Sequence, residues 1–392
     1  MRKFFGSPTT AIYACGFFFA VLLALTAYVN SSFLGTFLPA ASIGLVYSTA
    51  SVLGIILVLM IPRAFAQIGL YRTLVGLFVL SASCTYSLSL TNTKGIAIGL
   101  FVLWLVTNSL IVVSLDTLLE DYSENESVGS IRGAYLTTVN IAWVFSPLIS
   151  GAITRTIGYS GIYALGAFLV CVALAIVVIR FRTFRDPIYT TPSALVAVKD
   201  VFKNKNLLLI FAANFLLQAF YVVMVIYMPL YLHETLGYSW STIGWVFAIM
   251  LTPFVLFQFP LGKLADAIGE KKILYVGFAI IAVATIVSGV LGITLPLAWA
   301  AVLFATRAGA SSIEVMTESY FFKHVSGANP SIISAFRTLS PLAYIIIPAL
   351  ISVCAFTAVP STLFLVTGIC LLLGFLIIAK LKDNKAPLHE KK

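Results

Sequence analysis

One helical face of the segment after Pro296 carries three charged side chains, although only 10% of the 392 residues are charged. Arg307, Glu314 and Glu318 recur at spacings that place them on the same side of an α-helix. A guanidinium held away from water could bind an anion, or it could pair internally and only position helices. Glu314, together with Asp116 of an earlier segment, could take up and release a proton or act as a fixed ion-pair partner. These four side chains are the first candidates for a functional site.

The composition places these charges in a membrane protein. Hydrophobic residues make up 60% of the chain and the mean hydropathy is +1.05, whereas soluble domains carry roughly 25% charged residues. A helix that crosses the bilayer needs about 20 apolar residues, and the charge-free windows are long enough for twelve such helices. Two of the predicted spans end at residues 62 and 262, where charges follow. The sequence therefore predicts an all-α integral membrane protein.

A polar stretch in the middle of the chain divides it into domains. We expect an N-terminal six-helix bundle at 1–181, a cytoplasmic linker at 182–205, a C-terminal six-helix bundle at 206–381 and a cytoplasmic tail at 382–392. Within the linker, apolar and charged residues are mixed over 193–203 as in a short amphipathic helix that lies on the membrane surface.

The placement of Lys and Arg predicts the orientation. Of the 24 Lys and Arg, all but Lys94, Arg155 and Arg307 fall on the side of the two termini. Both termini are therefore expected in the cytoplasm of a cell-membrane protein. The net charge of +10 reflects this bias and an attraction to lipid headgroups, and not nucleic-acid binding, because the basic residues lie on short loops. The first charge-free run is too long for a signal peptide, so we expect a retained membrane helix.

Metal, cofactor and ATP chemistry find little support in the sequence. The three histidines are scattered, the five cysteines lie in apolar runs without CxxC spacing, and no GxxxxGK[ST] pattern occurs. We therefore expect no cofactor and no enzymatic activity. A membrane-embedded enzyme would need His or Cys beside the carboxylates, and only His324 lies close to them along the chain.

An internal repeat relates the two halves. The segment "SLDTLLEDY" (Ser114–Tyr122) matches "SIEVMTESY" (Ser312–Tyr320), and the segments that follow each of them match as well. Two parallel six-helix repeats around a central site are the architecture of many transporters. The aligned positions are Asp116 with Glu314, Glu120 with Glu318, Tyr122 with Tyr320, and 133–135 with 334–336.

A cluster of charge interrupts the apolar runs of the second half at "GKLADAIGEKK" (Gly262–Lys272). The pattern G-x-x-x-D-x-x-G-x-K resembles the signature loop of the major facilitator superfamily. With twelve predicted spans, both termini inside and a long central loop, the resemblance covers almost the whole chain. It implies two pseudo-symmetric six-helix bundles and a secondary transporter. Such a protein moves a small-molecule substrate by alternating access, driven by protons or Na+, and we expect a monomer.

The resemblance assigns roles to this loop position by position. Gly262 permits the close approach of two helices, and Gly269 makes the tight turn. Asp266 would face the N-terminus of a helix near Ser130, where a carboxylate satisfies exposed N–H groups and the positive end of the helix dipole. These contacts would hold a cytoplasmic gate shut. The alternative is a loop that is charged only because it lies in water.

Ion pairs are expected to complete the gate. In the second half, Lys271 or Lys272 would pair with Glu318 or Glu314 on the face that also carries Arg307. The first-half candidates are Arg63 or Arg72 with Asp116 or Glu120.

The first-half copy of the loop, "PRAFAQIGLYRT" (Pro62–Thr73), departs from the pattern. When the copies are aligned on Gly69, Ala66 replaces the aspartate and Pro62 replaces the first glycine. The helix cap on that side should therefore be missing or supplied by another residue.

Polar and aromatic side chains on the first and fourth spans of each half are candidates for substrate contacts, because these spans usually line the cavity in the superfamily. Each one taken singly is better explained by packing or an interhelical hydrogen bond. As a set they indicate a cavity of mixed polar and aromatic character. The candidates are Asn30, Asn108, Asn214, Gln218, Tyr28, Trp104, Tyr221 and Tyr227, with Arg307 as the contact for an anionic group.

The direction of transport and the substrate stay open. The stretch "NIAWVFSPLISG" (Asn140–Gly151) faintly resembles the Gly-Pro motif of antiporters, although Ser146 stands where glycine is expected, and it favours export of a drug or metabolite. The alternative is an uptake symporter that binds an organic anion through Arg307. A transport-inactive membrane sensor on the same fold is the alternative from another class.

Overall fold

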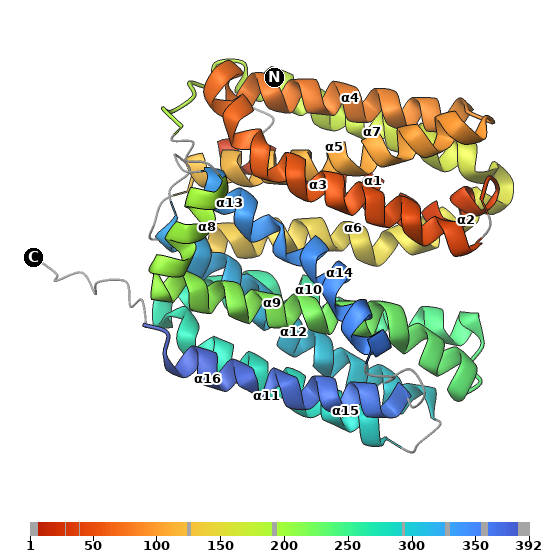
Figure 1. Ribbon diagram of the computed structural model, residues 1–392, viewed down its shortest axis with the longest axis vertical. Coiled ribbons are helices and arrows are strands. Elements are labelled where there is room, and N and C mark those ends of the chain that lie inside the picture. The colour runs from red at the N-terminus through yellow and green to blue at the C-terminus, as the bar shows by residue number, and fades with distance from the viewer. Residues whose placement is uncertain are drawn as a thin grey trace, which may run out of the picture. The chain divides into compact units, whose positions relative to one another are not determined.

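All regular secondary structure in the described part of the chain is helical (Figure 1). The computed structural model describes residues 7–27, 29–38, 40–123, 127–189, 194–291, 295–325, 330–353 and 360–382. Long apolar runs leave backbone N–H and C=O groups without water, and a helix satisfies these groups within one segment. The predicted all-α fold is confirmed.

The helices are given in chain order. They are α1 (Pro8–Ala27), α2 (Asn30–Gly35), α3 (Ala40–Ile68), α4 (Leu70–Leu90), α5 (Lys94–Asp121), α6 (Val128–Thr156), α7 (Gly158–Phe181), α8 (Ala194–Lys203), α9 (Lys205–Leu230), the π-helix η1 (Tyr231–Thr235), α10 (Trp240–Ile268), α11 (Glu270–Val290), α12 (Pro296–His324), α13 (Pro330–Arg337), α14 (Leu339–Val353), α15 (Pro360–Leu371) and α16 (Leu373–Ala379).

Ten stretches of helix in the described ranges are long and apolar enough to cross a membrane. The helices α6 and α12, each of 29 residues, are not among them because they carry more polar side chains. Together they make up the twelve predicted spans. The two least apolar spans also carry buried cations, Arg132 on α6 and Arg307 on α12.

The chain folds into two compact units. Unit 1 comprises Met1–Ser123, Thr138–Val198 and Val325–Thr338, and unit 2 comprises Glu124–Thr137, Lys199–His324 and Leu339–Lys392. The units follow the two sequence halves except for one exchange. The first part of α6 belongs to unit 2, and α13 belongs to unit 1.

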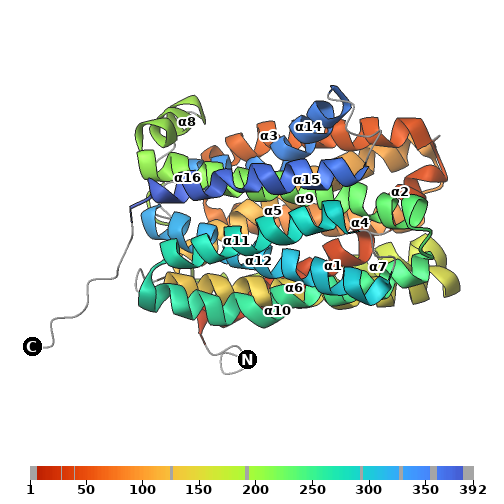
Figure 2. The ribbon, with the colours of Figure 1, turned by 90° about the horizontal axis from the view of Figure 1, so that it is seen from below.

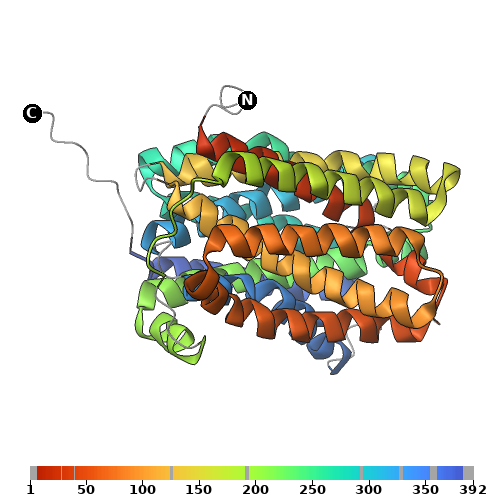
Figure 3. The ribbon, with the colours of Figure 1, turned by 90° about the horizontal axis from the view of Figure 1, so that it is seen from above.

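Neighbouring helices are arranged in the same way in both units. In unit 1, α4 packs against α5 and α7, while α1 packs against α7, α3 packs against α5, and α13 contacts α3 and α5 (Figure 3). In unit 2, α12 packs against α10 and α11, α15 packs against α11, and α14 packs against α9 (Figure 2). The repeat in the sequence is thus also a repeat of helix neighbours.

Helix ends differ from the charge-free windows. The helices α3 and α10 continue to Ile68 and Ile268 instead of ending at residues 62 and 262. Charge indicates where a helix leaves the bilayer, and the backbone hydrogen bonds continue past that point. Both helices end at a glycine of positive φ, Gly69 (90°) and Gly269 (84°), a conformation that glycine adopts without a steric penalty. The predicted helix at 193–203 is present as α8, and its position on the membrane surface stays a prediction.

Candidate functional site

Asp266 near the end of α10 caps the N-terminus of α6 within unit 2. Its carboxylate accepts hydrogen bonds from the backbone N–H of Gly129 at 2.9 Å and of Ser130 at 2.7 Å. The first N–H groups of a helix have no intrahelical acceptor, so a carboxylate there satisfies two donors and the positive end of the dipole. The contact expected near Ser130 is present, and the gating role of Asp266 stays a prediction.

Glycines allow α10 and α6 to approach closely at this cap. A Cβ atom on Gly129 would lie 2.5 Å from the carbonyl oxygen of Gly262, and one on Gly133 would lie 2.5 Å from that of Gln258. A Cβ on Gly262 would in turn collide with the Gly129 carbonyl group. No side chain fits between the two backbones at these positions. Gly262 therefore permits the close approach of two helices, as expected from the sequence.

A lysine from α12 balances the carboxylates of the α10–α11 turn. The Lys323 ammonium lies 3.1 Å from Asp266 and 2.7 Å from Glu270. Glu270 is fully buried, accepts a hydrogen bond from the Ser319 hydroxyl at 2.8 Å, and occupies the first position of α11, where the helix dipole favours a negative charge. Sequence reasoning missed this pair. The available signal was that Ser319 and Lys323 share one face of α12, which packs against both α10 and α11.

The predicted pairing of Lys271 with a carboxylate of α12 is wrong. The Lys271 ammonium donates hydrogen bonds to the carbonyl oxygens of Ala379 at 3.2 Å and Leu381 at 2.7 Å, at the end of α16. Lys272 is exposed. The turn presents its carboxylates, and not these two lysines, to α12. Glu318, the other carboxylate expected to pair with a lysine of this turn, is buried on α12. One turn later on α12, the ring centre of Phe322 lies 3.2 Å from the guanidinium carbon of Arg132 on α6.

The corresponding turn of unit 1, between α3 and α4, is capped from the linker. Asp186 accepts a hydrogen bond from the backbone N–H of Leu70 at 2.6 Å, so it caps α4. Three residues later, the Tyr189 hydroxyl donates to the Asp121 carboxylate at 3.1 Å. Burial, and then the charges of Asp121 and Asp186, raise the pKa of Tyr189, so the phenol stays a hydrogen-bond donor. The linker thus closes this turn with its own carboxylate.

Asp116 forms an ion pair that the sequence did not suggest. The Arg337 side chain of α13 donates its Nε–H to the Asp116 carboxylate at 2.5 Å, and Asp116 is buried on α5. The expected cations, Arg63 and Arg72, are both exposed. The predicted first-half pairing is therefore corrected: the partner of Asp116 comes from α13.

A second polar cluster of unit 2 surrounds the midpoint of α12. Arg307 is 3% exposed, and its guanidinium carbon lies 5.2 Å from the ring centre of Phe220 and 5.5 Å from that of Tyr221, both on α9. These are cation–π distances. The Tyr221 hydroxyl is buried without a hydrogen-bond partner among the described residues, and its ring contacts Phe254 of α10. A buried cation, an unsatisfied hydroxyl and aromatic faces together suit a ligand that is both anionic and apolar.

Glu314 lies two turns further along the same face of α12. Its carboxylate accepts a hydrogen bond from the Gln258 side-chain amide of α10 at 2.7 Å. A neutral amide is a different partner from an arginine, because it holds the side chain in place without adding a positive charge. Sequence reasoning placed Glu314 among the candidates and missed Gln258 as its partner.

The family follows from comparison with known proteins. The sequence model of the Major Facilitator Superfamily matches residues 9–249 and 236–392, so its two matches cover both halves. This chain belongs to the major facilitator superfamily. The predicted family and its twelve-helix fold of two pseudo-symmetric bundles are confirmed, and the protein is a multi-pass membrane protein and a secondary transporter. Among curated proteins, none matches the sequence.

Solved structures of the superfamily share the fold at low sequence identity. The human organic anion transporter MFSD10 (TETRAN) superposes with a TM-score of 0.78 at 12% identity, over 94% of this chain and 98% of that chain. The proton:xylose symporter XylE superposes with a TM-score of 0.72 at 15% identity, over 98% of this chain and 97% of that chain. Superfamily members are generally carriers and not enzymes.

The other polar residues predicted to line a superfamily cavity are placed in two groups. In unit 1, Asn30 accepts a hydrogen bond from the Tyr163 hydroxyl at 2.9 Å, and Asn108 accepts one from the Ser81 hydroxyl at 2.8 Å. These are interhelical packing contacts. In unit 2, Gln218 donates to Asn214 at 3.3 Å on α9, the helix that also carries Tyr221. Tyr28 lies outside the described residues.

Proposed function

We propose that the protein is a proton-coupled carrier of small solutes that bear an acidic group, with Arg307 as the anion contact. The observation that carries this proposal is the buried Arg307 guanidinium against the rings of Phe220 and Tyr221. An arginine at the centre of a membrane span costs at least about 2.5 kcal/mol, so it is retained where it has a function. MFSD10, which shares this fold, is an organic anion transporter, and this likeness supports the substrate class.

The surroundings of Arg307 define the substrate further. The Tyr221 hydroxyl offers a second polar contact, and Phe220 and Phe254 offer apolar surface. We infer a solute with one carboxylate or sulfonate and an aromatic or aliphatic body. Lysine could not replace Arg307 fully, because it lacks the planar fork that binds two oxygens at once.

Coupling is proposed at Glu314 and not at Asp116. Asp116 is already engaged in an ion pair with Arg337. Glu314 is held by the Gln258 amide, which can donate to the carboxylate or, after rotation, accept from the protonated acid. We propose that the coupling proton binds and leaves Glu314 at this hydrogen bond. XylE, which also shares this fold, is a proton symporter, and this likeness supports the choice of ion.

The cytoplasmic gate is proposed at the cap of α6. Asp266 holds Gly129 and Ser130 while Lys323 neutralises Asp266 and Glu270. When α6 separates from α10, the Asp266 carboxylate loses its two N–H donors, so opening the gate costs free energy. Gly262 and Gly269 set the spacing and the turn on which the cap depends. In alternating access, this cap would form and break once in each cycle.

Transport assays in proteoliposomes test the proposal. We expect purified protein to take up or release labelled organic acids but not their amides, with the rate rising when a proton gradient is imposed. Removing one partner of a desolvated charge contact costs about 2–5 kcal/mol, so Arg307→Ala should lower transport at low substrate concentration by about 30-fold or more. The direction of the proton gradient that drives transport distinguishes export from uptake.

Two variants keep this test interpretable. Arg307→Lys preserves the charge and should fold normally while binding the acid about tenfold more weakly. If Arg307→Lys matches the wild type for every acid tested, or if a neutral analogue is carried at the wild-type rate by Arg307→Ala, Arg307 only positions helices and the substrate class is wrong.

A further inference from the structure

A basic pocket of about 520 Å³ lies in unit 2, away from the clusters around Arg307 and Asp266. It is formed where α8 meets α9 and where the chain leaves α16. Its lining has four lysines and two asparagines and no carboxylate. The lining residues are Lys203, Asn204, Lys205, Asn206, Lys380 and Lys382.

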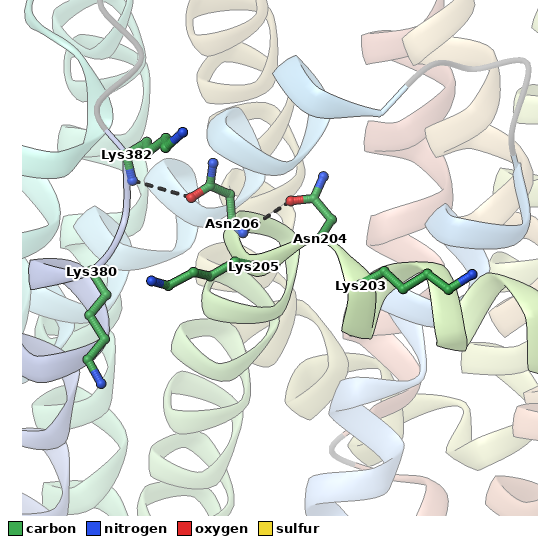
Figure 4. A pocket seen from close by; sticks show the side chains of 6 residues that line it. All are labelled: Lys203, Asn204, Lys205, Asn206, Lys380 and Lys382. Carbon is green, nitrogen blue, oxygen red and sulfur yellow. Dashed lines mark hydrogen bonds between the residues drawn. The ribbon is translucent and has the colours of Figure 1, made fainter.

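The lysines come from chain segments that are far apart in the sequence. Figure 4 shows Lys205 extending from the start of α9 toward the chain end that carries Lys380 and Lys382, while Lys203 lies at the outer edge on α8. In the same view the ammonium ends of Lys380 and Lys382 point apart (Figure 4). Like charges repel one another, so bringing these ammonium groups together around one pocket costs free energy unless an anion enters. The described residues that line the pocket carry the charge of an anion site and include no acidic side chain.

The walls of this pocket are held by hydrogen bonds. The Lys382 backbone N–H donates to the Asn206 side chain at 3.4 Å, and its carbonyl accepts from the Tyr320 hydroxyl at 3.0 Å. Lys271 binds the carbonyl groups of Ala379 and Leu381. Because these contacts use only the backbone at the end of α16, the Lys380 and Lys382 side chains stay available to the pocket.

The surface beside the pocket is apolar. Ile369, Leu373 and Leu376 recur at helical spacing on α15 and α16 and are exposed, Leu376 to 64%. The same spacing continues to Lys380, so an exposed apolar stripe ends at a cation. On the α8 side, Phe202 is 66% exposed next to Lys203. A soluble phosphate would use the cations alone, whereas a phospholipid would use both the cations and the stripe.

We propose that this pocket binds the phosphate headgroup of an anionic glycerophospholipid, with an acyl chain along the α15–α16 stripe. Lys205, Lys380 and Lys382 hold the phosphate oxygens, and Asn206 offers its amide N–H groups. On the orientation predicted from Lys and Arg, the pocket faces the cytoplasmic leaflet, where anionic lipids attract basic residues. Bound lipid would fasten the α8–α9 junction to the end of α16, whatever solute the protein carries.

Lipid titration of the purified full chain tests this site. Protein in a neutral detergent is titrated with phosphatidylglycerol, and bound lipid is counted by native mass spectrometry while the melting temperature is followed. We expect one tightly bound phosphatidylglycerol and a raised melting temperature. Phosphatidylcholine should bind at least about tenfold more weakly, since it lacks the net charge. Inorganic phosphate at millimolar concentration should not displace the lipid.

A matched pair of triple variants tests the residues. Lys205→Gln/Lys380→Gln/Lys382→Gln removes three charges from the pocket, and Arg63→Gln/Arg182→Gln/Arg185→Gln removes three exposed charges from unit 1. Each basic residue near an anionic surface contributes about a fivefold gain in affinity. The pocket variant should therefore bind phosphatidylglycerol more than tenfold more weakly than the wild type, and the control variant should bind it as tightly as the wild type.

Three results would each overturn the proposal. The first is equal binding by the pocket and control variants. The second is equal binding of phosphatidylcholine and phosphatidylglycerol, which would make the contact purely apolar. The third is displacement of phosphatidylglycerol by inorganic phosphate, which would mark a site for soluble anions. Because the pocket variant retains Asn206 and Tyr320, its melting temperature without added lipid should equal that of the wild type, which keeps a loss of binding distinct from misfolding.

Discussion

The α10–α11 turn of unit 2 and the α3–α4 turn of unit 1 have the same backbone and different chemistry. Gly269 and Gly69 adopt nearly the same conformation, with φ and ψ of 84° and 160° against 90° and 151°. In unit 2, Asp266 caps α6, whereas Ala66 stands at its position in unit 1. The fold thus preserves the turn independently of the carboxylate that the turn presents.

The helices that these turns face have changed with them. The repeat alignment that pairs 133–135 with 334–336 also pairs Gly129 with Pro330. Gly129 donates its N–H to Asp266, but Pro330 has no N–H to donate and begins α13. The acceptor and one of its donors are both missing in unit 1. A proline at the first helical position leaves one backbone N–H fewer that needs an acceptor. The aspartate could therefore be lost from unit 1 without leaving an N–H unpaired at this position.

The aligned carboxylates of α5 and α12 show the same division. Asp116 is paired with Arg337 in unit 1, whereas Glu314 is held by the Gln258 amide in unit 2. The first contact is an ion pair, and the second is a hydrogen bond from a neutral amide. The comparison predicts that unit 1 supplies the fixed ion pair of the transporter and unit 2 the titrating group.

The largest expected effect separates these two carboxylates. Glu314→Gln should abolish proton-driven accumulation while leaving downhill exchange of substrate measurable, because the variant can bind solute but cannot carry the proton. Asp116→Asn should retain coupling and instead lose stability. Proteoliposome uptake with and without a pH gradient measures both. Full gradient-driven transport by Glu314→Gln would move the coupling site elsewhere or make the protein a uniporter.

A smaller effect is expected from the buried charges around Lys323. Removing one partner of a buried ion pair costs about 3–5 kcal/mol, because the remaining charge stays buried. Lys323→Met should therefore lower thermal stability strongly, and Lys323→Met/Glu270→Gln should recover part of the loss. The exposed neighbour Lys272 provides the control, since Lys272→Met should change stability by less than about 0.5 kcal/mol. Equal losses for Lys323→Met and Lys272→Met would restore the pairing first predicted from the sequence.

The smallest effect concerns the cap itself. Asp266→Asn should cost about 1 kcal/mol and broaden the distance between labels on the cytoplasmic ends of α6 and α10, because the amide accepts the two N–H donors less well. Ala66→Asp should be nearly neutral, since Pro330 offers no donor. In a Pro330→Gly background, Ala66→Asp should become stabilising. An unchanged label distance in Asp266→Asn would remove the gate assignment, and a gain from Ala66→Asp alone would refute the role of Pro330.

Much of the fold was predictable because the bilayer imposes one rule on every span. Apolar length, the distribution of Lys and Arg and the central polar stretch predicted twelve helices, and the loop from Gly262 to Lys272 pointed to the family. The same loop predicted that Asp266 would lie near Ser130. These predictions depend on properties of one segment at a time, and hydrophobicity and glycine turns act locally.

Partners of the charged side chains were decided only by the tertiary structure. The sequence suggested Lys271 and Lys272 as cations for Glu314 and Glu318, and Arg63 and Arg72 for Asp116, but it did not suggest Lys323 or Arg337. Coulomb attraction does not distinguish among them in a sequence, because it depends on distance and on which face of each helix meets its neighbour. In the packed helices, Lys323 lies against Glu270 and Arg337 of α13 lies against Asp116. Lys271 instead binds the backbone at the end of α16.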